Sequence, residues 1–452
     1  MDIRRLLLIA PLPLLLALFA RLPTSSASRV PLYLEAIRAD LSPVRIRTNR
    51  LTKIVRVRSL DDSGPGTLRS CAAMSGSRIC IFEVAGAIFL RSPIRITQPH
   101  IFIAGETAPS PGITLTGSGI RIESHDVQLQ HLAIRPGDSL LGAKPSERDG
   151  VSVGVSPPAA AHHVHLDHLS LTWAIDENFS TWYPGTRGVS LTNSIIAEGL
   201  YDSIHPKGPH SKGALIGART TRILMRGNLL AFNEERNPYI EPGASVTFIN
   251  NLVYGWGPRG PWSACNLTNN DHSDLPVIAA MVGNVFIPGP FSFREKPPIF
   301  GKHIAPTSVL FVRDNLGTTR QRDGEDDSRI TSLSPPVELQ SSCPFHSGCR
   351  AALRANQVEA YVLQRAGSRP AERSAIDHRI VEQVRNRTGD LKDCTVGCER
   401  ETGALPNHSS TRRLLATPPR PFSDDDRDGL TNFEEWLRAF TMQAEGASGP
   451  AL

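Results

Sequence analysis

A loose internal repeat limits the fold of this chain more than any other feature. An apolar pattern of the form Val-x-Leu-x-polar ends at His131, at His168 and at Asn193. Short strands at such a period, each followed by a turn, predict a parallel β-solenoid whose interior is filled by apolar residues and whose turns stack asparagine side chains. Later apolar segments, spaced from the low twenties to the high thirties of residues, are followed by a polar residue at Asn228, Asn250, Asn284 and Asp314.

The composition agrees with a globular, strand-rich chain. Hydrophobic residues make up 40% and charged residues 21%, which favours a folded protein over a disordered one. Aromatic residues are 6%, while Gly and Pro number 36 each, which favours many short strands and turns. A β-sandwich is the alternative all-β fold, although its hairpin spacing would be shorter and more regular. The net charge of +5 permits attraction to a polyanion without establishing it.

The chain divides into five predicted segments. Residues 1–27 resemble a secretion signal, because Arg4 and Arg5 precede an apolar run over residues 6–20 and small residues follow. A retained membrane anchor is the alternative. The other segments are an N-terminal extension (28–53), the solenoid (54–320), an irregular and helical extension (321–417) and a proline-led acidic segment (418–440). Within them we expect strands over 54–57, 79–84 and 94–104 and helices over 67–73, 358–363 and 373–387.

Seven cysteines accompany the export signal, so disulfides are expected. Proximity in sequence favours the pairs Cys71–Cys80, Cys343–Cys349 and Cys394–Cys398, which leaves Cys265 unpaired. Other pairings remain open, because six cysteines alone allow about 15 connectivities.

Residues 201–243 contain a cationic cluster. In its two polar stretches, 201–217 and 233–243, two histidines, two lysines and an arginine lie among glycines and prolines, which predicts loops between strands. Cations on loops suit an anionic substrate, whereas the alternative is a solvated loop with cations present by chance. Upstream, Asp167, Asp176 and Glu177 form either a salt-bridge network with these cations or a calcium site.

A second candidate calcium site lies near the C-terminus. Carboxylates at Asp424, Asp426 and Asp428 take positions 1, 3 and 5 of an EF-hand loop, with Gly429 at position 6 and Glu435 at position 12. The backbone carbonyl of Leu430 takes position 7. The alternative is an acidic helix N-terminus. A single loop of this kind is expected to be structural.

Several motifs in this order resemble pectate lyases of polysaccharide lyase family one. The resemblance covers about residues 54–320, and the combination of motifs is specific although each alone is weak. It implies a right-handed parallel β-helix that cleaves polygalacturonate by β-elimination with the help of Ca²⁺. The motifs are Gly64-Pro-Gly66-Thr-Leu-Arg69, Ala104-Gly-Glu-Thr-Ala-Pro109, Asp167-His168, the pair Asp176-Glu177, His205-Pro-Lys207-Gly, His210-Ser-Lys212-Gly and Arg236-Asn-Pro238.

The resemblance also implies roles for individual residues. Arg236 corresponds to the base that takes the proton, and Lys212 to the lysine that holds the sugar acid. Asp167 corresponds most clearly to a calcium ligand, and Asp176 and Glu177 stand where the family has further acidic ligands. Lys207, His205 and His210 correspond to substrate contacts.

Two positions depart from the family pattern. Glu241 stands where the family often has a second arginine, so substrate binding or specificity is expected to differ. Leu169 and Ser194 stand where close relatives have cysteines, so one disulfide is replaced by ordinary packing.

The resemblance implies an alkaline working pH, because arginine ordinarily stays protonated below pH of about 12. It predicts a secreted, monomeric enzyme that binds acidic polysaccharide and neither nucleic acid nor, after signal cleavage, membranes. The alternatives are a non-catalytic, calcium-assisted polysaccharide-binding solenoid and a β-helical glycoside hydrolase, which would need a close pair of carboxylic acids.

Overall fold

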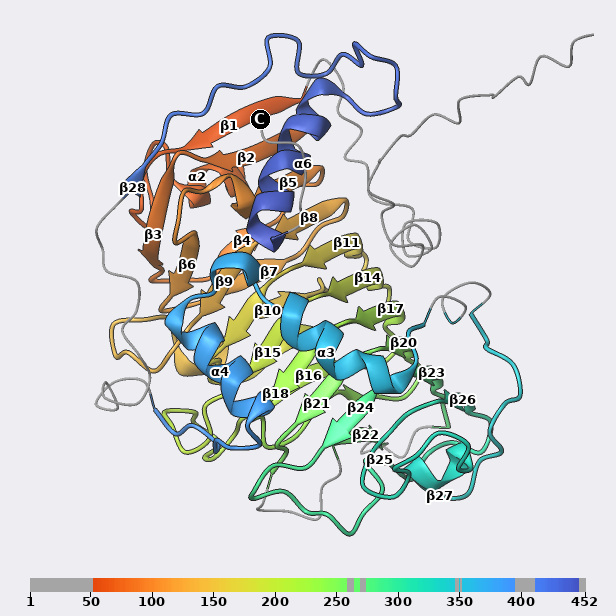
Figure 1. Ribbon diagram of the computed structural model, residues 1–452. Helices are drawn as coiled ribbons and strands as arrows, with labels where there is room; N and C mark the ends of the chain where they lie inside the picture. The colour runs from red at the N-terminus through yellow and green to blue at the C-terminus, as the bar shows by residue number, and fades with distance from the viewer. Residues whose placement is uncertain are drawn as a thin grey trace, which may run out of the picture.

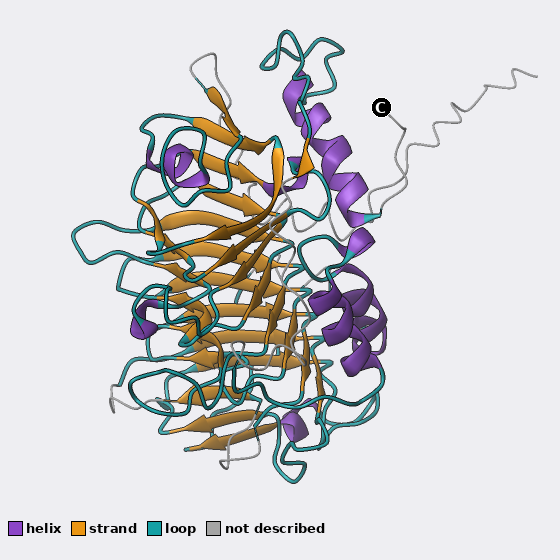
Figure 2. Ribbon diagram, turned by 90° about the vertical axis from the view of Figure 1, so that its left-hand side faces the viewer, coloured by secondary structure: helices purple, strands orange, loops and turns teal. Residues whose placement is uncertain are grey.

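The backbone winds into a stack of coils. The computed structural model describes residues 52–257, 264–268, 274–345, 349, 352–394 and 411–446. Within these residues the strands form three sheets, and consecutive strands pass from one sheet to the next (Figures 1 and 2). Pairing is parallel except for one antiparallel contact between β28 and β3. The predicted right-handed parallel β-helix is therefore confirmed. The predicted signal, residues 1–27, lies outside the described residues.

The three sheets are named sheet I, sheet II and sheet III. Sheet I consists of β1 (Lys53–Val57), β2 (Arg78–Phe82), β5 (Ile101–Ala104), β8 (Val127–Gln130), β11 (His162–Asp167), β14 (Arg187–Thr192), β17 (Thr221–Arg226), β20 (Ser245–Ile249), β23 (Ile278–Val282) and β26 (Val309–Arg313). Sheet II consists of β4 (Ile94–Ile96), β7 (Ile120–Ile122), β10 (Val151–Val153), β13 (Glu177–Thr181), β16 (Lys212–Ile216), β19 (Tyr239–Ile240), β22 (Cys265–Thr268), β25 (Ile299–Lys302) and β27 (Thr331–Ser334). Sheet III consists of β28 (Thr411–Arg412), β3 (Val84–Phe89), β6 (Ile113–Thr116), β9 (Leu132–Arg135), β12 (Ser170–Thr172), β15 (Ile195–Ala197), β18 (Leu229–Ala231), β21 (Leu252–Tyr254) and β24 (Val285–Ile287).

The sequence repeat maps onto sheet I in register. Val127 pairs with Val164, and Leu129 pairs with Leu166 one coil along. All four side chains are fully buried in the interior of the coils. Valine stacks on valine and leucine on leucine, so neighbouring coils present apolar side chains of the same size at the same height. This arrangement favours dense packing of the core.

A single residue in the left-handed region turns the chain from sheet I to sheet III. His131, His168 and Asn193 adopt φ angles of 55°, 48° and 47° at this turn. Histidine and asparagine tolerate this conformation better than β-branched or bulky residues do. The polar residue of the repeat is therefore the residue that makes the turn.

An asparagine ladder follows this turn, one residue later than two of the predicted positions. Asn250 and Asp314 occupy the turn itself, with φ of 53° and 54°. The stacked amides are those of Asn228, Asn251, Asn284 and Asn315, which are linked by side-chain hydrogen bonds of 2.9, 3.1 and 2.8 Å. The predicted stacking of asparagines is confirmed, but its membership is corrected, since Asn250 does not belong to it and Asn251 does.

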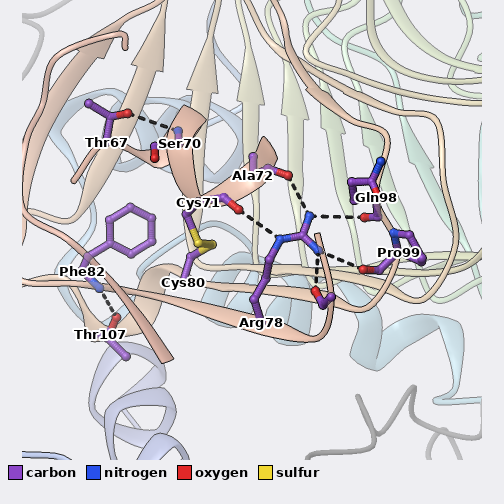
Figure 3. Close-up of a disulfide and its surroundings, with 11 residues drawn as sticks. Thr67, Ser70, Cys71, Ala72, Arg78, Cys80, Phe82, Gln98, Pro99 and Thr107 are labelled. Carbon is purple, nitrogen blue, oxygen red and sulfur yellow. Dashed lines mark hydrogen bonds between the residues drawn. A yellow bond between two sulfur atoms is a disulfide. The ribbon is translucent and has the colours of Figure 1, made fainter. Parts of the chain in front are cut away.

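A short helix covers the N-terminal end of the coils. Helix α2 (Leu68–Ala73) begins after Thr67, whose hydroxyl accepts a hydrogen bond from the backbone N–H of Ser70. The disulfide Cys71–Cys80 joins it to β2, as predicted (Figure 3). The buried guanidinium of Arg78 donates to the carbonyls of Cys71 and Ala72 at the end of the helix and thereby satisfies acceptors that the helix leaves free.

Three further helices lie along one side of the stack (Figures 1 and 2). Helices α3 (Ala355–Arg365) and α4 (Ala375–Arg385) bury apolar faces against strands of sheet III, as the predicted helical periodicity requires. Helix α6 (Asn432–Glu445) buries Phe433 and Leu437 against β2 and β5 of sheet I. Among the described residues, no helix combines the length and the hydropathy that crossing a bilayer demands.

The structure corrects two of the expected element boundaries and shows the state of the remaining cysteines. The segment 94–104 is not one strand, because a turn separates β4 from β5. Strand β27 extends sheet II to Ser334, past residue 320 where the solenoid was expected to end. The pair Cys343–Cys349 is present and Cys265 is free and buried, while Cys398, the predicted partner of the disulfide-bonded Cys394, lies outside the described residues.

Candidate active site

The predicted reactive residues converge where strands of sheet II begin. Glu177 opens β13 and Lys212 opens β16, and the two pair in register in adjacent coils. Lys212 in turn forms a parallel bridge with Glu235 in the next coil. Because parallel coils stack equivalent positions at one height, residues far apart in sequence form a single column of charged side chains.

A cluster of three carboxylates lies at the start of this column. Oxygen atoms of Asp149, Asp176 and Glu177 lie within 4.8 Å of one another. Burial, followed by the negative charge of Asp176, raises the pKa of Asp149 to about 7. Burial raises the pKa of Glu177 as well, against the opposing effect of Arg236. Three close carboxylates repel one another, and hard oxygen ligands of this kind fit a calcium ion.

Arg236 lies directly against this carboxylate cluster. Its Nη1 donates to Glu177 Oε1, its Nε lies 3.7 Å from Glu235 Oε1, and its Cζ lies 5.5 Å from the centre of the Tyr239 ring. The Nε atom is buried and lacks a hydrogen-bond partner within the described part of the chain. The φ angle of 65° is uncommon for a non-glycine residue, and such strain concentrates at functional sites.

Lys212 belongs to the same site. Its ammonium donates to Glu235 Oε1 at 2.5 Å, and the residue is 8% exposed. Glu235 thus contacts both cations that the resemblance implicates, Lys212 and Arg236. The structure therefore brings the predicted base and the predicted substrate lysine together.

Two stacked histidines border the cluster on the other side. The rings of His205 and His210 lie 3.5 Å apart, with Nε2 atoms 3.6 and 3.4 Å from Asp176 carboxylate oxygens. Burial would raise the pKa of Asp176, but the hydrogen bond and charge of His210 outweigh it and hold the pKa at about 2. Asp176 is therefore ionised over the whole neutral range. Lys207 lies nearby and is exposed.

Asp167 does not belong to this site, which corrects one prediction. Asp167 ends β11 of sheet I, and its carboxylate accepts hydrogen bonds from His168, Thr192 and Asn193. Its dipeptide Asp-His occupies the turn between sheets I and III rather than the face of sheet II. Asp167 therefore cannot share a cation with Asp176 and Glu177.

Asp149 takes the third place in the carboxylate cluster, and the sequence reasoning missed it. It lies just before β10, which pairs in register with β13 one coil later. Its carboxylate accepts a hydrogen bond from Ser180 at 3.3 Å. The available signal was an Asp-Gly pair immediately before an alternating Val-Ser-Val strand, one coil upstream of Asp176 and Glu177.

The two family departures have structural explanations. Glu241 accepts a hydrogen bond from the backbone N–H of Ala218 at 2.8 Å, so its carboxylate anchors a loop between coils. Ser194 Oγ accepts a hydrogen bond from the N–H of Leu169 at 2.9 Å. The two residues are thus neighbours, and a hydrogen bond connects them in place of a disulfide.

The acidic segment before α6 folds into a tight loop. Carboxylate oxygens of Asp424, Asp426 and Asp428 lie within 4.8 Å of one another. Gly429, at φ 92°, donates its N–H to Asp424 Oδ2 at 3.1 Å, a conformation that glycine adopts without strain. Desolvation and then the three aspartates raise the pKa of Glu435, so this carboxylate faces the same cluster. Helix α6 begins after Thr431 with a capping box.

A parallel β-helix with an arginine and a lysine beside three carboxylates is the framework of a polysaccharide lyase. A comparison with models of known families finds no match. Among curated proteins, the chain is 32% identical over 346 residues to the probable pectate lyase C of Neosartorya fischeri, covering 75% of this chain and 73% of the relative. It is also 32% identical over 405 residues to the probable pectate lyase C of Emericella nidulans, covering 85% and 86%.

The chain therefore belongs to the pectate lyase family and is a polysaccharide lyase. Among solved structures it is similar to jun a 1, the major allergen of cedar pollen, with a TM-score of 0.47 and 15% identity over 70% of this chain and 88% of that one. It is similar also to a pectate lyase of Bacillus sp. N165 solved with trigalacturonate, with a TM-score of 0.43 and 14% identity over 70% and 93%.

Proposed function

We propose that the protein is a secreted, calcium-dependent pectate lyase that cleaves polygalacturonate by β-elimination and releases 4,5-unsaturated oligogalacturonides. The contact of Arg236 with Glu177, at the edge of the carboxylate cluster, carries the proposal. This contact places a candidate base beside the candidate metal site. The relatives named above support the choice of substrate class.

The reaction begins with removal of the proton from the carbon next to the sugar carboxylate. Arg236 takes this proton, the electron pair forms a carbon–carbon double bond, and the bond to the glycosidic oxygen breaks. The leaving oxygen takes a proton from water. Calcium bound by Asp149, Asp176 and Glu177 would neutralise the substrate carboxylate and so acidify the neighbouring carbon.

The remaining residues of the site bind and orient the substrate. Lys212, held by Glu235 in the free protein, exchanges this partner for a substrate carboxylate. His205 and His210 lie beside Asp176, and the exposed Lys207 lies near His205, where a neighbouring sugar of the polymer would bind. Glu241 supports the loop at residue 218 and does not bind substrate carboxylates, since it carries the same charge.

The C-terminal loop is proposed as a second, structural calcium site. Asp424, Asp426, Asp428 and Glu435 supply carboxylates and Leu430 supplies a carbonyl, the ligand set of an EF-hand loop. Export of the protein is proposed from the signal-like residues 1–27. We also propose that the exported protein is a monomer. The two disulfides agree with an oxidising compartment.

Incubation of the purified protein with polygalacturonate tests this function. A lyase gives ultraviolet absorbance from the unsaturated product, in calcium and not in excess chelator. New reducing ends without this absorbance would indicate a glycoside hydrolase. Retention on the polymer with neither signal would indicate a binding protein. Either outcome overturns the proposal.

A further inference from the structure

A second cluster of potential metal ligands lies at the turns from sheet I to sheet III. It comprises His131, His168 and Glu445, whose ligand atoms lie within 4.8 Å of one another. The two histidines make the turns from sheet I to sheet III in adjacent coils, and their rings stack with centroids 5.0 Å apart. Glu445 is the last residue of α6, which runs over β2, β5 and β8 (Figure 1).

His131 presents an unsatisfied nitrogen to this cluster. Its side chain is fully buried, and its Nδ1 lies 2.8 Å from the carbonyl oxygen of Ser368. A carbonyl only accepts hydrogen bonds, so Nδ1 carries the proton and Nε2 keeps a lone pair. Within the described residues Nε2 has no hydrogen-bond partner, and it lies 3.8 Å from Glu445 Oε1. A buried acceptor without a partner destabilises the folded state.

His168 lies between two carboxylates. Its Nδ1 lies 2.7 Å from Asp167 Oδ2, and Asp167 is fixed by hydrogen bonds from Thr192 and Asn193. Glu445 Oε1 lies 3.6 Å from the same Nδ1. A metal ion beside Glu445 would therefore take the place of the Nδ1 proton of His168.

The surroundings supply negative charge. Glu106 is 2% exposed, and neither of its carboxylate oxygens has a hydrogen-bond partner in the described part of the chain. Asp167 and Glu445 lie close enough to act on it electrostatically. Burial raises the pKa of Glu106 to about 8, so the negative charge beside the two imidazoles comes from Asp167 and Glu445, and the nearby guanidinium of Arg369 offsets part of it.

We propose that His131, His168 and Glu445 bind a divalent transition metal, zinc being the best match, which fastens the end of helix α6 to the coils. Two imidazole nitrogens and one carboxylate suit zinc, whereas calcium prefers oxygen ligands alone. Tetrahedral ligands at 2.0–2.1 Å from zinc lie about 3.3 Å apart, so on binding the side chains draw together and the stacked imidazole rings turn toward the ion. The site is separate from the residues proposed for the lyase reaction, because its residues lie at the turns from sheet I to sheet III and at the end of α6.

The competing description of these groups is an ion network without metal. In it a protonated His168 lies between Asp167 and Glu445, and α6 is held by this ion pair. That network leaves His131 Nε2 unsatisfied, which the metal site does not. The two descriptions differ in a measurable way, since only one predicts stoichiometric zinc.

Zinc titration of the full chain in saturating calcium decides between them. Two other clusters, His100 with His125 and Asp126 and His205 with His210 and Asp176, could bind zinc as well, so the reference protein carries His125→Ala and His210→Ala. We expect it to bind one zinc and to melt at a higher temperature with zinc than without. Cobalt in place of zinc should give the visible absorbance of tetrahedral coordination.

The decisive variant adds Glu445→Gln to this reference protein. Glu445 is 20% exposed at the end of a helix, so this change should leave the fold intact. We expect at least a tenfold loss of zinc affinity and loss of the melting shift. His131→Gln should have the same effect. Zinc binding that is absent in the reference protein, or unchanged by Glu445→Gln, would overturn the proposal in favour of the ion network.

Discussion

Arg236 and Glu177 form an ion pair although 59 residues separate them in the chain. Glu177 also belongs to the carboxylate cluster with Asp149 and Asp176, so one side chain connects the candidate base to the candidate calcium site. In a solenoid such contacts between coils are the rule, because each turn of the chain returns to the same face one coil further on.

Replacement of Arg236 by lysine should lower the rate of product formation at least about 100-fold, which is the effect of removing a positioned base. The variant should still bind polygalacturonate and calcium, because the carboxylates and Lys212 remain. Absorbance of the unsaturated product measures the rate. Arg187→Lys, at an exposed arginine on sheet I, is the matched control and should keep full activity. Comparable losses in both variants would argue against a specific role for Arg236.

Mutations should distinguish the roles of the two proposed calcium sites. Asp176→Asn should raise the calcium concentration needed for half-maximal activity by at least about tenfold, because a carboxylate is lost from the ligand set. Asp426→Asn should leave that concentration unchanged but abolish the stabilisation of the protein by calcium at the C-terminal loop. Activity against calcium concentration and melting temperature against calcium concentration measure the two effects. If Asp426→Asn alone raised the calcium requirement of catalysis, the assignment would be reversed.

Activity should increase from neutral to alkaline pH. A guanidinium acts as a base only after losing a proton, which low pH opposes. Protonation of the carboxylate cluster adds to the loss, because the pKa of Asp149 lies at about 7 without calcium. Initial rates between pH 6 and pH 11 at saturating calcium, with each sample returned to pH 9 as a check on stability, test this. Full activity at mildly acidic pH in chelator would contradict the mechanism.

Glu106 should make the metal-free protein less stable as the pH rises. Burial raises the pKa of Glu106 to about 8, well above its value of about 4.5 in an unfolded chain. Below the unfolded value both states are protonated. Between the two values only the unfolded state ionises, so the free energy of unfolding falls by at most about 1.4 kcal/mol per pH unit. Glu106→Gln should flatten this slope in urea denaturation with chelator present. An unchanged slope would exclude Glu106 as its source.

The asparagine ladder should contribute measurably to stability. Asn251→Ala removes hydrogen bonds to Asn228 and Asn284 and leaves buried polar groups without partners. We expect a loss of about 2–3 kcal/mol in the free energy of unfolding. Asn356→Ala, at an exposed position on α3, is the control and should change stability by less than about 0.5 kcal/mol. Equal effects would show that the ladder is not a specific source of stability.

The repeat and the local motifs were sufficient to predict the fold and part of the site. The stacking of Val127 on Val164 follows from a pattern and spacing that are typical of a parallel solenoid. The helix periodicity of residues 373–387 and the disulfide Cys71–Cys80 depend on neighbours in sequence, so they too were predicted correctly. Arg236 and Lys212 were identified by resemblance, and the structure brings them together at Glu235.

Only the tertiary structure decided which residues share a site. Asp167 and Asp149 each lie near strands and turns that look alike in sequence, yet one ends a strand of sheet I and the other precedes a strand of sheet II. The sequence likewise did not show which asparagines stack or that Glu445 lies close to His131. The first depends on the lengths of the coils, and the second on how α6 packs against them. The sequence determines the period of a solenoid through local patterns of burial. Which face a given residue occupies depends on the exact length of every intervening turn, and no local pattern encodes that sum.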